Sequence, residues 1–521
     1  MHIDLDQTPA GQSFHAPVCV IGGGIAGLIL AVRLADKGIE VHLLEAGGLE
    51  FEQRSQDLYK SEMASGNHRG SNDGRFRTFG GSSTQWGGQL LPFTPDIFNP
   101  PPGSPSMPWP IQEHELTPYY NDVQNILGVD PLPWTADLLP TLGHPAPAPS
   151  SDILLRFAKW TPFNKRNLAQ TVGAQALAHP RITVFSHANA ASLTTDPANP
   201  AKIQSVRVLN YARDEFTFTG DHVVLAAGTV ECSRLLLLSP TIPNPHDQIG
   251  RYFHDHVAYH AARFESPTRE RIVERLGPYY VDGTIHSCKL EASPTLRGRD
   301  HLYAVMAHVV VIEPDDSGTA AIRNILRSLQ SGRLKEAIST NLLPMLHGLG
   351  DVARLLYYSR FKKRRAVSKR AILRLNIDVE QSPNPENRIL LSPTQTDALG
   401  LPSVIVDWCI SEPEQDTAAR YAYIIQDYLL AHNIAPQEWN QSVLDHTPPF
   451  MLDTNHAMGG LRMGNDPATS VVDPNLTVHG LRNLHVASCA VFPSGSSSNP
   501  TFTMMALTLR LADRLAAQLT A

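Results

Sequence analysis

A chain of 521 residues is too long for one simple hydrophobic core, so we expect two domains. Its formal net charge of −7 excludes a general attraction to nucleic acid or to an anionic membrane. The five cysteines are scattered and lack CxxC spacing, which favours reduced thiols over a disulfide framework or a metal site. No apolar run is long enough for a transmembrane segment and the first residues lack a secretory signal, so we expect a cytoplasmic protein.

The first predicted elements are a strand, a glycine-rich turn and a helix. The apolar run Val18–Ile21 predicts a buried strand, and a helix is expected over residues 26–37. The three glycines between them have GxGxxG spacing. Gly22 allows a tight turn, Gly24 allows close approach to a pyrophosphate, and Gly27 allows the helix to pack closely. The N-terminal end of that helix would point its N–H groups at the phosphates, so the segment predicts a dinucleotide site.

Glu45 ends the second predicted strand, residues 40–44. A carboxylate about 20 residues past the glycines can accept a hydrogen bond from a ribose 2′-hydroxyl, which favours FAD or NAD over NADP. A second glycine cluster, GGSSTQWGG at residues 80–88, predicts another close approach of backbone to a ligand. This cluster favours FAD, because an NAD dehydrogenase would proceed directly to its next βα unit.

Further along, the chain leaves the dinucleotide-binding domain and returns to it twice. A proline-rich stretch at residues 91–150 predicts an extended connection. A second excursion begins near His256. The other expected elements are strands at 181–185, 203–210, 222–227 and 372–380, and helices at 230–238, at 413–432 and from Pro500 onward.

Residues 323–370 differ from the rest of the chain. They carry twelve Lys or Arg residues against Glu336 and Asp351. The simpler interpretation is a solvated helical insertion. The alternative is a lid, or a docking surface for a membrane or an electron-accepting partner.

Two residues near the end of the chain suit the chemistry of alcohol oxidation. His456 stands in the glycine-rich stretch NHAMGGLRMG, and histidine is the usual general base because its pKa lies near neutral pH. Asn499 is expected to cap the last helix, with Pro500 as the first helical residue. The positive end of that helix would stabilise an anionic reduced flavin. The Asn499 amide would then stand beside the base and could hold a hydroxyl oxygen.

Taken in order, these segments resemble the glucose–methanol–choline (GMC) oxidoreductase family over nearly the whole chain. The resemblance rests on VIGGGIAGL with Glu45, GGSSTQWGG, AAGTVECSRLLLLS, IGRYFHDH, and HAMGGLRMG followed by SSSNPTFTMMAL. It implies an α/β protein whose Rossmann-like FAD-binding domain is joined to a discontinuous α+β substrate-binding domain built on an antiparallel sheet. It also implies oxidation of an alcohol by hydride transfer to flavin N5, with His456 as the catalytic histidine and Asn499 at the second catalytic position. The implied partners are a small-molecule alcohol and an electron acceptor, either O2 or another compound.

Within the family, the end of the chain looks most like the pyranose oxidase and bacterial glycoside 3-oxidase branch. That likeness implies oxidation of a secondary alcohol of a sugar or glycoside to the ketone. Pyranose oxidases often attach FAD through the histidine of a Ser-Thr-His-Trp segment, and Gln85 stands at that position here, so non-covalent FAD is implied. Two departures concern the cofactor contacts. Ser488 and Cys489 replace the usual Asp-Ala or Asp-Gly pair, and Cys232 replaces a Ser or Thr.

The predicted domains and FAD site follow from these motifs and the resemblance. The FAD-binding domain is expected at residues 1–92, 165–258 and 452–521, and the substrate-binding domain at 93–164 and 259–451 with a basic insertion at 320–370. The residues expected to bind FAD are Gly22, Gly24, Ile25, Ala26, Gly27, Glu45, Ala46, Gly80, Gly81, Ser82, Ser83, Gln85, Trp86, Gly87, Gly88, Ala190, Ala227, Gly228, Ser488, Cys489, Asn499, Pro500 and Thr501.

Three other functions are compatible with these motifs. A sterol or other hydrophobic alcohol is the alternative substrate, because sterol oxidases also pair His with Asn. A pocket lined by Trp and polar groups would favour a sugar, and a long apolar tunnel would favour a sterol. A flavin lyase of the same fold would not bleach its flavin with any alcohol. A protein that keeps FAD only for structure would have no need of His456 beside the ring.

Overall fold

The computed structural model describes residues 1–520 except 67, 146–149, 265–267, 316–317, 331–348, 366, 369, 435, 437 and 446. Part of the basic segment, residues 331–348, therefore lies outside the described residues. It is flanked by α12 (Gly318–Gln330) and α14 (Leu349–Phe361). Among the helices that the structure describes, none has both the length and the apolarity needed to cross a membrane.

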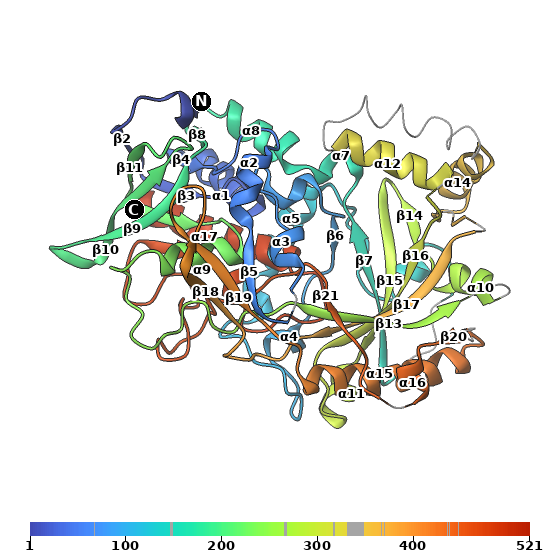
Figure 1. Ribbon diagram of the computed structural model, residues 1–521. Coiled ribbons are helices and arrows are strands. Elements are labelled where there is room, and N and C mark those ends of the chain that lie inside the picture. Colours follow the sequence, from blue (N-terminus) through green and yellow to red (C-terminus); the bar gives the residue numbers. More distant parts are fainter. Residues whose placement is uncertain are drawn as a thin grey trace.

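One half of the molecule is built on a six-stranded parallel sheet (Figure 1, left). Its strands, in spatial order, are β1 (His2–Asp4), β8 (Ile182–Ser186), β4 (Val41–Leu44), β3 (Val18–Ile21), β12 (His222–Leu225) and β22 (Leu484–Val486). The helices packed together with it are α1 (Ile25–Asp36), α8 (Val172–Ala178) and α17 (Thr501–Thr520). All four residues of β3 are buried, as the apolar run predicts for a central parallel strand. The strands come from three separate stretches of the chain, so both ends of the sequence meet in one sheet.

A four-stranded sheet packs against the parallel sheet through aromatic side chains. Its strands are β2 (Ser13–His15), β11 (Glu215–Thr219), β10 (Asn199–Leu209) and β9 (Asn189–Asp196). The Phe14 and Phe218 rings lie 4.8 Å from the Phe185 ring of the parallel sheet, centroid to centroid. The helix α9 (Thr229–Leu237) follows β12 and contacts both β9 and a three-stranded sheet. That third sheet contains β18 (Arg388–Thr396), β19 (Pro402–Asp407) and β5 (Ser61–Ser65).

The other half contains a nine-stranded antiparallel sheet (Figure 1, right). Its strands are β20 (Glu438–Trp439), β13 (His256–Phe264), β17 (Ile372–Glu380), β16 (Val305–Ile312), β15 (Thr284–Ala292), β7 (Ile153–Trp160) and β6 (Gln89–Leu90), with β14 (Tyr279–Val281) and β21 (Leu452–Asp453) at its margins. The long helix α15 (Glu412–Ala431) covers one face of this sheet. Tyr421, Ile425 and Leu429 of α15 belong to the same buried cluster as the apolar residues of β17.

Short helices complete the structure. They are α2 (Gln53–Gln56), α3 (Gly70–Asp73), α4 (Pro95–Phe98), α5 (Tyr120–Leu127), α6 (Leu138–Thr141), α7 (Phe163–Arg166), α10 (Thr268–Arg275), α11 (Pro294–Arg299) and α16 (Gln441–Leu444). The parallel and antiparallel sheets confirm the predicted fold class. The predicted domain boundaries stay a prediction. All five cysteines are free thiols, as their spacing indicated.

Candidate active site

The turn after β3 has the geometry that its glycines predict. Gly22 has a φ of +109°, and a Cβ there would lie 2.6 Å from the Ala226 carbonyl oxygen. A Cβ on Gly27 would lie 1.9 Å from the Gly22 carbonyl oxygen, so this glycine lets α1 pack directly on the turn. A Cβ on Gly24 would meet nothing closer than Gly81 Cα at 4.0 Å. The three glycines therefore serve three different purposes, and only Gly24 faces open space.

Glu45 is fixed at the end of β4 by backbone donors. Its carboxylate accepts hydrogen bonds from Gly23 N–H at 2.9 Å and from Gly47 N–H at 2.7 Å. Burial raises the pKa of Glu45 above its ordinary value, and these two N–H groups oppose that rise. Each carboxylate oxygen has a second lone pair, so the side chain can still accept a ribose hydroxyl.

A single cavity connects the glycine turn with the C-terminal histidine. Most of the residues predicted to bind FAD line it, together with His456. They are Gly22, Gly24, Ile25, Ala26, Glu45, Ala46, Gly81, Ser82, Ala190, Ala227, Gly228, Ser488, Cys489, Pro500 and Thr501. The predicted residues outside this lining are Gly27, Gly80, Ser83, Gln85, Trp86, Gly87, Gly88 and Asn499.

Several residues of the second glycine cluster form hydrogen bonds that hold this cluster beside the turn. Gly80 N–H donates to the Gly23 carbonyl at 2.8 Å, and Ser83 Oγ donates to the Gly80 carbonyl at 2.6 Å. Trp86 Nε1 donates to the Arg166 carbonyl at 2.8 Å. Gln85 is exposed. The cluster thus holds Gly81 and Ser82 against the cavity.

The cavity also has charged lining residues that the sequence analysis missed. Glu231 lies 3.0 Å from Arg75, 3.6 Å from Arg77 and 3.5 Å from Arg234. Burial alone would raise the pKa of Glu231, but the three guanidinium groups hold it below its ordinary value. Glu231 and Arg234 lie within the AAGTVECSRLLLLS motif, whereas Arg75 and Arg77 carry no recognisable pattern.

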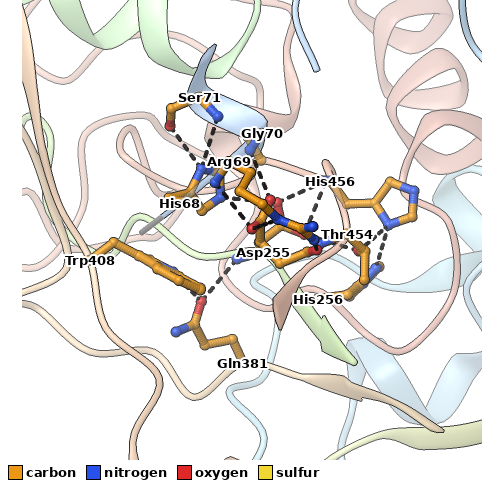
Figure 2. Close-up of polar contacts among 12 residues, drawn as sticks. His68, Arg69, Gly70, Ser71, Asp255, His256, Gln381, Trp408, Thr454 and His456 are labelled. Carbon is orange, nitrogen blue, oxygen red and sulfur yellow. Dashed lines mark hydrogen bonds and ion pairs between the residues drawn. The ribbon is translucent and has the colours of Figure 1, made fainter. Parts of the chain in front are cut away.

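Asp255 anchors the backbone of His456 (Figure 2). His456 N–H donates to Asp255 Oδ2 at 2.8 Å, and Thr454 Oγ1 donates to Oδ1 at 3.1 Å. His68 Nε2 lies 3.1 Å from Oδ2 on the opposite side. Burial opposes ionisation of Asp255, yet the His68 hydrogen bond and the nearby His456 and His256 lower its pKa to about 2. A buried carboxylate therefore fixes the loop between β21 and the glycines of NHAMGGLRMG.

A chain of hydrogen bonds sets the tautomer of His456. His256 Nε2 lies 2.9 Å from the Gly495 carbonyl, which can only accept, so this nitrogen carries a proton. In the neutral imidazole, His256 Nδ1 then offers a lone pair, and it lies 2.9 Å from His456 Nδ1. His456 must therefore be protonated at Nδ1, which leaves a lone pair on Nε2. Thr454 Oγ1, 2.9 Å away, is a second acceptor for the same Nδ1–H.

The Asn499 side chain donates to that lone pair, with Asn499 Nδ2 3.1 Å from His456 Nε2. The expectation that Asn499 caps the last helix is therefore wrong. Helix α17 begins at Thr501, and the Pro500 carbonyl accepts from Met504 N–H at 3.0 Å. Asn499 Oδ1 is buried and has no hydrogen-bond partner among the described residues. The amide thus contacts the base and keeps one free acceptor.

His456 is fully neutral at physiological pH. Burial lowers its pKa to about 4, and His256 and the Lys289 ammonium add to this, while Asp255 opposes it. The two other histidines of the IGRYFHDH motif have their Nδ1 atoms engaged. His254 Nδ1 bonds the Tyr252 carbonyl at 2.8 Å, and His256 Nδ1 faces His456. Of these three histidines, His456 is the one that lines the cavity.

The residues present fit a bound dinucleotide. The open space at Gly24 is one that a Cβ would enter, and it lies beside the N-terminal end of α1, which favours phosphate groups. Glu45 provides the acceptor for a ribose, and Asn499 Oδ1 is a buried acceptor without a partner among the described residues. FAD would therefore be held by the turn residues and by the segments around residues 188–190, 226–228 and 487–489.

Comparison with known proteins agrees with this arrangement. Residues 383–508 match the family model described as GMC oxidoreductase, and residues 20–49 match the NAD(P)-binding Rossmann-like domain. The chain therefore contains the C-terminal segment of the GMC oxidoreductases, which confirms the resemblance seen in the motifs. It is an FAD-dependent oxidoreductase acting on CH–OH groups.

The similar curated proteins include enzymes named for sugars and glycosides. The chain is 24% identical to the 6'''-hydroxyparomomycin C oxidase of Streptomyces lividus, over 97% of this chain and 92% of that protein. It is 25% identical to the fructose dehydrogenase large subunit of Gluconobacter japonicus, over 67% of this chain but only 55% of that subunit. A shorter stretch, 29% of this chain and 28% of the other, is 29% identical to the C-glycoside 3-oxidase of Microbacterium trichothecenolyticum. The crystal structure of pyridoxine 4-oxidase from Mesorbium loti shares the fold, with a TM-score of 0.57 and 16% identity over 96% of this chain and 99% of that one.

Proposed function

We propose that this enzyme oxidises a secondary alcohol of a sugar or glycoside to the ketone, with His456 as the general base. The observation that carries this proposal is the lone pair of His456 Nε2, which is set by His256, accepts from the Asn499 amide, and belongs to a residue that lines the cavity of the glycine turn. An alcohol cannot readily release a hydride while its oxygen keeps its proton, so the reaction needs a base at this point.

The side chains around His456 each have a defined part in the proposed reaction. The substrate hydroxyl donates to His456 Nε2, replacing the hydrogen bond from Asn499 Nδ2. The Asn499 amide, still adjacent, binds the substrate oxygen as negative charge develops on it. The proton moves to His456 Nε2, and the resulting imidazolium keeps its Nδ1–H bonded to His256 and Thr454. Bound FAD would accept the hydride at its N5 atom.

Asp255 favours this proton transfer without touching the substrate. Its carboxylate accepts the His456 N–H at 2.8 Å, so it fixes the position of the base. Its negative charge also raises the pKa of His456 against the lowering effect of burial, which stabilises the protonated base that the reaction produces.

A sugar substrate is supported by the polarity of the sheet face next to His256. Trp160, Ser287, Lys289, His308 and Asp378 project from this face of the antiparallel sheet, and such polar side chains suit the hydroxyl groups of a sugar better than the apolar surface of a sterol. The names of the sugar and glycoside oxidoreductases among the similar proteins point the same way. Non-covalent attachment of FAD is part of the same proposal, because Gln85 is exposed and cannot form the histidyl bond of pyranose oxidases.

Anaerobic flavin bleaching tests this function. The protein would be mixed, without oxygen, with a panel of pyranoses, glycosides and sterols, and its absorbance followed near 450 nm. We expect bleaching with a sugar or glycoside and none with sterols. Air admitted afterwards would restore the colour if O2 is the acceptor. Bleaching by sterols alone would overturn the sugar assignment, and no bleaching by any alcohol would favour a lyase.

A further inference from the structure

The face of the antiparallel sheet opposite α15 has a buried chain of ionisable side chains. In β17, Leu373, Leu375, Ile377 and Val379 are fully buried and pack on the α15 side. Because side chains alternate along a strand, Asp378 and Glu380 point to the other face. Glu380 is directly paired with His256, so Asp378 shares the face of the residue that contacts His456.

Three residues on neighbouring strands form this chain. Lys289 of β15 is completely buried, and its Nζ lies 2.6 Å from His308 Nδ1 of β16. The ammonium can only donate, so His308 Nδ1 accepts and its Nε2 carries the proton. His308 Nε2 lies 3.1 Å from Asp378 Oδ2. The order is therefore ammonium, neutral imidazole and carboxylate.

The Asp378 carboxylate, at the end of this series of side chains, lacks hydrogen-bond donors among the described residues. His308 Nε2 is close to it but not aligned for a hydrogen bond, since that nitrogen has no hydrogen-bond partner among the described residues. No other described residue donates a hydrogen bond to the carboxylate, and 14% of the side chain remains exposed. Burial raises the pKa of Asp378, and Lys289 and His256 oppose that rise. A carboxylate in this position needs donors that the described part of the chain does not supply.

The same groups lie within electrostatic reach of the proposed base. The Lys289 ammonium lowers the pKa of His456, and His256 lowers that of Asp378. Asp378 lies two residues along β17 from Glu380, which pairs with His256, so its carboxylate lies on the sheet face next to the residue that contacts His456. Because the Lys289 ammonium balances the Asp378 charge through His308, these three side chains are neutral as a group and match a neutral hydrogen-bond donor.

We propose that Asp378, backed by His308 and Lys289, binds ring hydroxyl groups of the substrate and selects a neutral polyhydroxylated sugar. This inference rests on the proposed function and specifies its substrate class. A carboxylate accepts hydrogen bonds from adjacent hydroxyls, which a sugar ring presents and a sterol does not. A hydrogen bond to a charged group also discriminates strongly against an analogue that lacks the donor.

Asp378→Asn tests the proposal, with Asp416→Asn as the matched control. Asp416 is an exposed residue of α15, paired with Arg420, on the other side of the sheet. For the best sugar of the bleaching panel, we expect Asp378→Asn to raise KM, and the Kd of an unreactive sugar analogue, roughly 10- to 100-fold. We expect kcat to change less, and Asp416→Asn to behave like the parent. Flavin occupancy and near-UV circular dichroism would show that both variants fold.

A series of single deoxy analogues needs no variant and tests the same contact. One analogue should lose roughly 10- to 100-fold in kcat/KM with the parent, and that loss should disappear in Asp378→Asn. An amino-deoxy analogue at that position should bind the parent no more tightly than the neutral sugar. Unchanged KM and Kd in Asp378→Asn, equal deoxy losses in both proteins, or tighter binding of the amino analogue would each overturn the proposal. Failure of the parent to oxidise any sugar would instead overturn the proposed function.

Discussion

Valine at two glycines of the first turn should cause two different defects: impaired folding in Gly27→Val and loss of FAD binding in Gly24→Val. A Cβ on Gly27 would lie 1.9 Å from the Gly22 carbonyl oxygen, so turn and helix must separate by about 1.5 Å to reach an ordinary 3.4 Å contact. Overpacking of this kind costs about 1–3 kcal/mol or more. Gly27→Val should therefore fold poorly whether or not FAD is present.

Gly24→Val should fold normally but fail to bind FAD. The position has an ordinary φ of −81° and nothing within 4 Å of its Cβ except Gly81 Cα at 4.0 Å, so the apoprotein tolerates a side chain. That side chain would occupy the space proposed for the pyrophosphate. A loss of at least about 100-fold in FAD affinity is expected, about 2.7 kcal/mol.

Two measurements separate these outcomes. Thermal unfolding of the apoproteins should place Gly24→Val with the parent and Gly27→Val well below it. After FAD addition, the ratio of absorbance at 450 nm to absorbance at 280 nm should be lower in both variants than in the parent. Full flavin occupancy in Gly24→Val would refute the placement of the cofactor, and parent-like unfolding of Gly27→Val would refute the packing argument.

Three further predictions concern charge and cofactor attachment. Asp255→Asn should destabilise the protein by about 2 kcal/mol at pH 7, because Asp255 ionises at a pKa of about 2 instead of 3.8. The stability that the ionised Asp255 contributes is present above pH 3.8 and is lost as the pH falls towards 2. Urea unfolding at pH 7 checks it, with Asp416→Asn as control, and equal midpoints for both variants would contradict it. The rate of flavin reduction should stay constant down to about pH 5 and fall near pH 4, because the pKa of His456 is lowered to about 4. A fall in this rate centred at the ordinary histidine pKa of 6.5 would show that His456 is not buried as described. Acid precipitation should release the flavin into the supernatant because Gln85 replaces the linking histidine, and yellow colour retained in the washed pellet would disprove non-covalent attachment.

Local patterns predicted the first elements well. The strand Val18–Ile21 and the turn after it are encoded by neighbouring residues, so periodicity and glycine spacing suffice. The pairing of His456 with Asn499 came from the family resemblance, since the two residues meet only through the tertiary fold. The cap predicted for Asn499 failed because a hydrogen bond to His456 replaces the local bond to the helix.

The remaining site residues were beyond sequence reasoning for a physical reason. Asp255 and His256 lie in the quoted IGRYFHDH motif, but their contacts with His456 depend on how β13 meets the loop after β21. Arg75 and Arg77 act through a carboxylate some 150 positions away in sequence, at Glu231, and no short-range pattern records such a pair. The interpretation of the basic segment stays open, because residues 331–348 lie outside the described part of the chain.

The most direct test of the account is the rate of anaerobic flavin reduction in His456→Ala, with FAD bound and the best sugar substrate saturating. Loss of the general base should slow reduction by roughly 10²–10⁴-fold, or about 3–5 kcal/mol in the barrier. Asn499→Ala should cost less, about 10- to 100-fold, and the double variant should lose less than the product of the two effects, because both act on one substrate oxygen. Reduction of His456→Ala at close to the parent rate would contradict the assignment, and the base would then have to be sought first at His254 and His256.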